Sequence, residues 1–333
     1  MTKAKLVFDP FSADFFDGAY ETYRRMRDEA PVYYNDEYDF YALTRHEDVA
    51  AAFKDFETYS SAHGVDLAMI RKGVPPEQRS IIFMDPPEHR HMRALVNKVF
   101  TPRAIGALRP MVTKVIDQFL AAVNPDRFDV VQDFSAPFPV EVITRMLGVP
   151  AEHRQQVRHW IDTTLHRAPG QLEVDEAGWE ASVQTGTMYY NLIQERRAHP
   201  QDDMISKLIA AEVERDDGHK TQLGDIEIAG FATILGGAGA ETVTKLIGNA
   251  VVLFARNPDQ WQKLLDDRGK IATAVEEVLR YEAPSQYNVR YLAQRRSPAR
   301  LHDPGRQPRL PDRWLRKPGP GRVHRRRQVR HRP

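Results

Sequence analysis

The chain has 333 residues, of which 41% are hydrophobic, and this is enough to bury one large core or two ordinary ones. It contains no cysteine, so disulfide bonds, cysteine-ligated zinc and thiol nucleophiles are excluded for the chain as written. The formal net charge is +1, but residues 295–333 carry 14 Lys and Arg against 2 Asp and Glu, whereas the remainder carries 33 against 44. The last segment therefore differs in composition from the rest.

Neither a signal peptide nor a membrane anchor is expected from the sequence. The N-terminus, MTKAKLVFDPFSADFFDG, has no long apolar run. The longest apolar stretch, residues 228–240, is shorter than the ~20 residues that a membrane span needs, and Glu241 follows it directly. We therefore expect a soluble, cytoplasmic protein.

The spacing of apolar residues predicts a mainly α fold with a small β element. Residues 31–44 carry alternating apolar and aromatic residues around the polar break NDEYD, which predicts a β-hairpin. Apolar residues then recur every three or four positions, and polar helices are expected through 150–215. Before this polar region, the predicted helices cover residues 46–55, 88–100, 105–123 and 139–149. After it, we expect a long helix from about Leu223 to Arg256 and a last helix over 271–284.

The long helix contains three glycines near its centre, Gly236, Gly237 and Gly239. Each costs about 1 kcal/mol relative to alanine within a helix. One interpretation is close packing of a second helix against the small residues. The other is that a flat, rigid ligand lies there, with Glu241 and Thr242 beside it to handle protons. The stretch GGAGAET is not a phosphate-binding loop, because it lacks the Gly-Lys-Ser/Thr ending.

Two further pairs of charged residues each have two interpretations. His89 and Arg93 are four residues apart and share a helix face. They either form a solvated surface or bind the carboxylates of a ligand. Glu277 and Arg280 are three residues apart. They form either a surface ion pair that contributes under about 1 kcal/mol or a buried pair that holds the fold around a site.

Together, three segments resemble the C-, I- and K-helix signatures of a bacterial soluble cytochrome P450: MDPPEHRHMR (84–93), AGAET (238–242) and EEVLRYEAP (276–284). The resemblance extends from the hairpin to about Gln294. It implies a cytochrome P450-like domain over residues 1–294, mainly α with a small β-sheet subdomain and incomplete at the C-terminus. The implied activity is a haem-dependent monooxygenase that hydroxylates or epoxidises an apolar small molecule such as a lipid, terpenoid or sterol.

The resemblance also implies cofactor, partners and residue roles. These are haem b, dioxygen, a ferredoxin or flavoprotein reductase as electron donor, and a monomeric state. Glu241 and Thr242 would deliver protons, and Glu277 and Arg280 would form a structural ion pair beneath the haem. Ala238 and Gly239 would form the groove that binds dioxygen, and three cations would bind the haem propionates: His89, Arg93 and Arg290. Five apolar residues are candidates for the substrate pocket, with plain core packing as the alternative for each: Val65, Leu67, Ile70, Ile234 and Leu235.

The Arg/Pro-rich tail, residues 295–333, stands where the family carries its iron ligand. That ligand is a cysteine thiolate C-terminal to the last helix, and no metal ligand of this type is present. Back-translated and read one base later, residues 298–333 allow a sequence with TIPAG and SANRDP, which resembles the family at this point. We therefore interpret the tail as out of frame and disordered, after a frameshift near residue 295, and expect the chain as written to be inactive.

An alternative interpretation treats the chain as a non-catalytic remnant. Its basic tail would then bind nucleic acid or other polyanions electrostatically and without specificity. We expect no specific nucleic-acid partner in either case.

Overall fold

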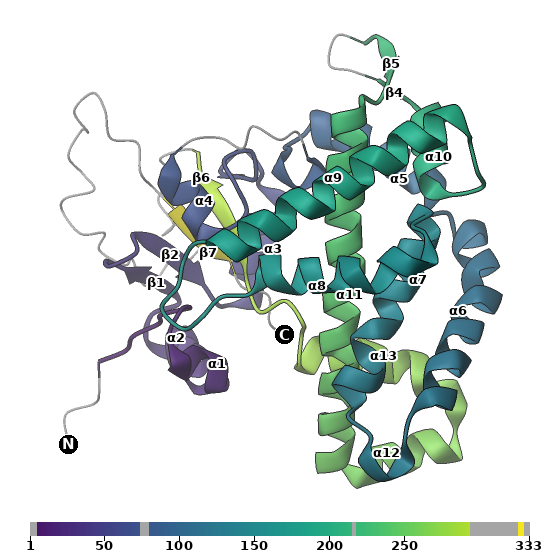
Figure 1. Cartoon of the computed structure of the whole chain (residues 1–333). Coiled ribbons are helices and arrows are strands. Elements are labelled where there is room, and N and C mark those ends of the chain that lie inside the picture. Colours follow the sequence, from purple (N-terminus) through teal and green to yellow (C-terminus); the bar gives the residue numbers. More distant parts are fainter. Residues whose placement is uncertain (1–4, 74–79, 215–217, 294–325, 330–333) are drawn as a thin grey trace.

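The computed structural model describes residues 5–73, 80–214, 218–293 and 326–329, with a smaller β-containing part beside a larger helical part (Figure 1). The predicted hairpin is confirmed: β1 pairs antiparallel with β2, with Val32 opposite Leu43 and Asn35 opposite Phe40. In the β-containing part, the elements are α1 (Ala13–Gly18), α2 (Tyr20–Glu29), β1 (Val32–Asn35), β2 (Phe40–Leu43), α3 (His46–Lys54), β3 (Tyr59–Ser60), α4 (Leu67–Lys72), β6 (Asn288–Leu292) and β7 (Arg326–Val329).

The five strands of this sheet come from both ends of the chain, in the order β1-β2-β7-β6-β3. β7 runs parallel to β2 and antiparallel to β6. Within the tail, the structure thus shows a strand at residues 326–329, where the sequence predicts disorder, and the rest of that prediction lies outside the described residues. The sheet and the first helices share an aromatic core in which Phe8 contacts Tyr23 and Phe40 edge to face.

The helical part agrees with the predicted periodicity, and the mainly α fold class with a small sheet is confirmed. The longest helix, α11, lies near the centre of this part (Figure 1), and it packs against α7, α8 and α9. The helices are α5 (Glu88–Val99), α6 (Pro102–Ala122), α7 (Pro137–Leu147), α8 (Arg154–Leu165), α9 (Glu176–Ala198), α10 (Met204–Ala210), α11 (Asp225–Arg256), α12 (Pro258–Asp266) and α13 (Ile271–Tyr281). A short hairpin joins α10 to α11, made of β4 (Glu212–Glu214) and β5 (Lys220–Gln222).

Local signals explain where several helices begin and end. The Thr101 hydroxyl accepts a hydrogen bond from the amide of Ala104, and Pro102 occupies the first turn, so α6 begins three residues before its apolar pattern. The Asp203 carboxylate caps α10 by accepting from the Ser206 amide. At the other end of a helix, Gly148 adopts a φ of 86°, which ends α7 in the left-handed region that glycine tolerates.

By length and composition alone, α11 also meets the criterion for a membrane-spanning helix. The central helix of a water-soluble domain can meet the same criterion, because both are long and apolar. Here the first half of α11 is buried among α7 and α9, including Ile228 and Ala232, both fully inaccessible. The first half of α11 thus packs as a core helix does, whereas only 6% of the 18-residue window that meets the criterion is buried.

Candidate active site

A cavity of about 760 Å³ lies beside the middle of α11. Its walls come from four separate segments: the N-terminal region around α1, the end of α8, α11 itself, and residues 282–287 after α13. The segment after α13 reaches the cavity because α13 ends at Tyr281, before Pro284. The volume lies within the range of ~300–1,000 Å³ that is usual for small-molecule sites.

Glu241 and Thr242 both line this cavity, together with Lys245 one turn further along α11. The Glu241 carboxylate pairs with the Lys245 ammonium, with Oε1 and Nζ 2.5 Å apart. The Thr242 hydroxyl donates to the carbonyl of Ala238 at 2.8 Å, one turn back in the helix. A carboxylate and a hydroxyl thus stand side by side at the cavity wall, where they can exchange protons with a bound molecule.

The three glycines of α11 differ in what they face. A Cβ atom at Gly236 would lie 2.8 Å from the Tyr189 hydroxyl of α9, and one at Gly239 would lie 3.0–3.3 Å from the Ile143 side chain of α7. A Cβ at Gly237 would meet nothing within 4 Å. Close helix packing therefore explains Gly236 and Gly239. In the described residues, neither Ala238 nor Gly239 belongs to the cavity wall, and the oxygen groove expected at these two positions stays a prediction.

We expect opposite effects from two neighbouring substitutions in α11. Gly236→Ala should lower the free energy of unfolding by about 1–3 kcal/mol, because the buried Tyr189 ring would have to move. Gly237→Ala should raise it by about 1 kcal/mol, because alanine favours the helix and has open space there. Chemical denaturation followed by circular dichroism measures both. Equal effects of the two substitutions would contradict the packing assigned to Gly236.

The three cations predicted at the propionates lie on α5 and β6. His89 is half-buried and Arg93 is exposed on α5, whereas Arg290 is half-buried on β6. The Arg290 guanidinium lies 5.8 Å from the centre of the Phe53 ring. Burial lowers the pKa of Arg290, and the nearby Asp85 carboxylate partly offsets this.

Asp85 connects the start of α5 with the sheet. Its carboxylate accepts hydrogen bonds from the Ser60 hydroxyl and from the Ser61 amide, and its carbonyl accepts from the His89 amide at 3.0 Å. β3, which contains Ser60, pairs with β6, which contains Arg290. One acidic residue thus ties the segment with His89 to the sheet that carries Arg290.

Glu277 and Arg280 form a bidentate ion pair on α13, with N–O distances of 2.6 and 2.7 Å. The Arg280 guanidinium holds the pKa of the Glu277 carboxyl below its usual range. Both side chains are about half exposed, at 58% and 47%. The structural role beneath the haem that the resemblance implies for this pair stays a prediction.

The five predicted substrate-pocket residues lie outside the cavity wall in the described part of the chain. Leu67 and Ile70 of α4 are buried at 6% and 3% exposure, and Leu67 packs in the aromatic core. Leu235 packs against the main core, while Val65 and Ile234 are half-buried. The core interpretation therefore fits Leu67, Ile70 and Leu235.

The cavity wall contains residues that the sequence did not single out. Its apolar side chains include Phe11 and Phe15 near α1, Leu165 at the end of α8, and Tyr287 after α13. Tyr287 follows the EEVLRYEAP segment closely, and that position is a signal that could have indicated it. Nothing in the sequence around Phe11 or Leu165 indicates a shared site.

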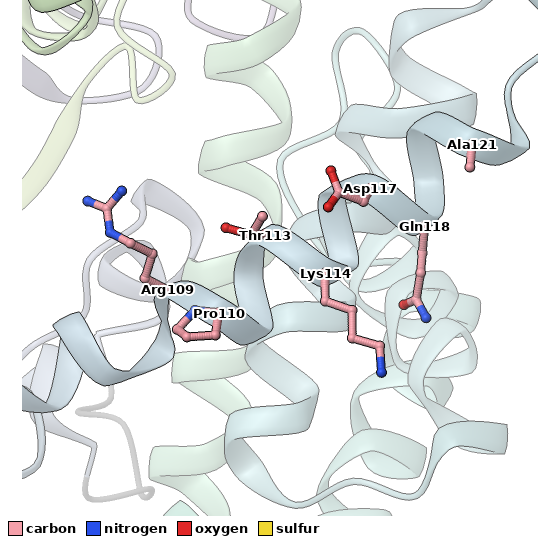
Figure 2. A pocket seen from close by; sticks show the side chains of 7 residues that line it. All are labelled: Arg109, Pro110, Thr113, Lys114, Asp117, Gln118 and Ala121. Atoms are coloured by element: carbon pink, nitrogen blue, oxygen red, sulfur yellow. The ribbon is translucent and has the colours of Figure 1, made fainter.

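A second hollow, of about 660 Å³, lies along one helix only. It is lined by seven residues of α6, including Arg109 and Lys114 (Figure 2). None of the predicted site residues lies in it, so we do not assign it a function.

The residues present fit only one part of the haem that the resemblance implies. The cations His89, Arg93 and Arg290 have the charge that propionate carboxylates require. The axial position of this family requires a thiolate, and the chain contains no cysteine. In the described ranges, no group of three or more His, Asp or Glu residues could hold a metal ion either.

Sequence and structure comparisons place the chain among known proteins, although no family model matches it. It is 39% identical over 291 residues to putative cytochrome P450 123 of Mycobacterium tuberculosis, across 87% of this chain and 71% of that protein. It is 35% identical over 294 residues to cytochrome P450 130 of the same species, across 84% of this chain and 70% of that protein.

Among solved structures, substrate-free CYP109E1 from Bacillus megaterium matches with a TM-score of 0.76 and 28% identity, over 94% of this chain and 76% of that one. P450BioI in complex with an acyl carrier protein also matches with a TM-score of 0.76, at 26% identity, over 96% of this chain and 77% of that one. The chain therefore belongs to the bacterial cytochrome P450 family, whose members are monooxygenases with haem b as their cofactor.

Proposed function

We propose that this chain represents a cytoplasmic monooxygenase that inserts one oxygen atom from dioxygen into an apolar small molecule. The single observation that carries the proposal is the cavity of about 760 Å³, whose wall contains Glu241 and Thr242 together with aromatic side chains such as Phe11 and Phe15. Electrons would come from a ferredoxin or flavoprotein reductase.

The similar proteins support an apolar substrate. One relative, 35% identical over 267 residues, is the erythromycin C-12 hydroxylase of Saccharopolyspora erythraea. CYP109E1 was solved in complex with testosterone and with corticosterone, and P450BioI with a protein-linked hexadecenoic acid. These ligands share a large apolar body, so a lipid, terpenoid or sterol fits the proposal.

The haem supplies the activation of dioxygen when it is bound, and the residues of this chain have the other tasks. His89, Arg93 and Arg290 would hold its propionates. Glu241 and Thr242 would hold and transfer protons at the cavity wall, with Lys245 keeping the Glu241 carboxylate in place. Phe11, Phe15 and Tyr287 would exclude water from the bound substrate.

We further propose that the chain as written is inactive, because a frameshift near residue 295 replaced the segment with the axial cysteine. Sequencing the DNA across codons 290–300 tests this. The expected result is a one-base difference that returns the later codons to a frame with TIPAG, SANRDP and, beyond them, a cysteine. An unchanged sequence in genomic DNA and transcript, with no cysteine in either other frame downstream, would contradict the frameshift.

A further inference from the structure

The charged residues of the 760 Å³ cavity are unequally paired. Glu241 pairs with Lys245, whereas the Glu282 carboxylate accepts a hydrogen bond from the uncharged Tyr20 hydroxyl and keeps its negative charge. Arg167, an arginine of the same wall, has no acidic partner among the residues that the structure describes. The wall therefore holds one cation, Arg167, and one anion, Glu282, for which the described residues provide no oppositely charged partner.

The Arg167 guanidinium is held by backbone carbonyls at the end of α8. Its Nη1 donates to the carbonyl of Thr164 at 2.9 Å and to that of His166 at 2.6 Å. An arginine has five N–H donors in a planar fork. Two are used here, so the Nε–H and both Nη2–H groups remain without a partner in the described part of the chain. Two of them lie on one edge of the guanidinium, the arrangement that binds a carboxylate through two parallel hydrogen bonds.

One part of the wall suits an apolar body. Phe15 contacts Tyr287 edge to face, with ring centres 5.9 Å apart, and Phe11 and Leu165 extend the apolar surface. Glu241 and Thr242 lie in the same cavity on a different helix from the one that precedes Arg167. A molecule anchored by a charged end at Arg167 can therefore present its apolar part to Glu241 and Thr242.

We propose that Arg167 is a specificity-determining residue that binds the carboxylate of an amphipathic monocarboxylate substrate. The proposal rests on the proposed function, because it takes the 760 Å³ cavity to be the substrate site. The anchored carboxylate would fix which carbon of the apolar body lies beside Thr242. Uncharged molecules of the same size would bind without this fixed position.

Calorimetric titration of the full chain with dodecanoate and with 1-dodecanol, below the concentration at which either aggregates, tests this. A hydrogen bond to a charged partner contributes enough to change an affinity by about 10- to 100-fold. We therefore expect dodecanoate to bind the unmodified chain 10- to 100-fold more tightly than dodecanol. Arg167→Gln should remove this preference and leave dodecanol binding unchanged.

Two further variants separate recognition from a structural role of Arg167 at the end of α8. Arg167→Lys should keep part of the preference, because it keeps the charge but loses the fork. Arg109→Gln, in the separate α6 hollow (Figure 2), should keep all of it. Equal affinity of the two probes for the unmodified chain, failure of dodecanoate to bind, or the full preference in Arg167→Gln would overturn the proposal.

These titrations need no haem and no electron donor. A chain that prefers dodecanoate but, with its reading frame restored, oxidises nothing would contradict only the proposed function. A restored enzyme that is active but shows no preference for the carboxylate would contradict only the assignment of Arg167.

Discussion

Replacement of Asp203 by alanine is expected to lower the free energy of unfolding by about 3–5 kcal/mol, because it leaves a buried charge without its counter-ion. Asp203 and Arg196 are 7% and 4% exposed, and their Oδ2 and Nε atoms are 2.5 Å apart. Arg196 also pairs with Glu195, but that carboxylate is 52% exposed and its charge is screened by water. Asp203→Ala also removes the cap of α10.

The same pair joins three helices of the domain. Arg196 lies on α9, Asp203 precedes α10, and the Arg196 Nη2 donates to the carbonyl of Gly148 at the end of α7, 2.8 Å away. α7 in turn carries Ile143, which packs against Gly239 of α11. Loss of the pair should therefore loosen the support of α11 as well as α10.

The adjacent residue provides a matched control for this prediction. Asp202 pairs with Lys207, but the two side chains are 93% and 58% exposed. Asp202→Ala should therefore change the free energy of unfolding by less than about 1 kcal/mol. Chemical denaturation of both variants measures the difference. Comparable losses in the two would contradict the buried role of Asp203.

The second large effect is expected from correcting the reading frame. A one-base correction of the DNA near codon 295 should give a chain that binds haem through a thiolate, whereas the chain as written should not bind haem in this way. The physical reason is that cysteine is the ligand that this family requires, and 333 residues without one cannot supply it. Absorption spectra of both purified proteins measure the change. The restored chain with serine in place of its ligand cysteine is the control, and it should lose the thiolate spectrum.

Much of the fold was predictable because its signals are local. The hairpin follows from the alternating side chains around NDEYD. The helices α11 and α13 follow from the spacing of their apolar residues, and they end shortly before Pro258 and Pro284 respectively. The start of α6 at Pro102 was missed, although Thr101 and Pro102 form a recognisable helix start.

The site was predictable only where one segment carries it. Glu241 and Thr242 are neighbours in one helix, so their presence at one wall follows from the sequence. The cavity also needs Phe11, Arg167 and Tyr287, which are separated by more than a hundred residues each and meet only through tertiary packing. The requirement for glycine at position 239 likewise comes from the packing of Ile143, almost a hundred residues away in the sequence.

The spectrum of the 333-residue chain after incubation with haem, reduction and addition of carbon monoxide shows most directly whether the missing cysteine abolishes thiolate ligation. We expect no thiolate-type Soret shift, because the chain has no cysteine that could supply the thiolate. A thiolate-type shift from this chain would contradict this expectation.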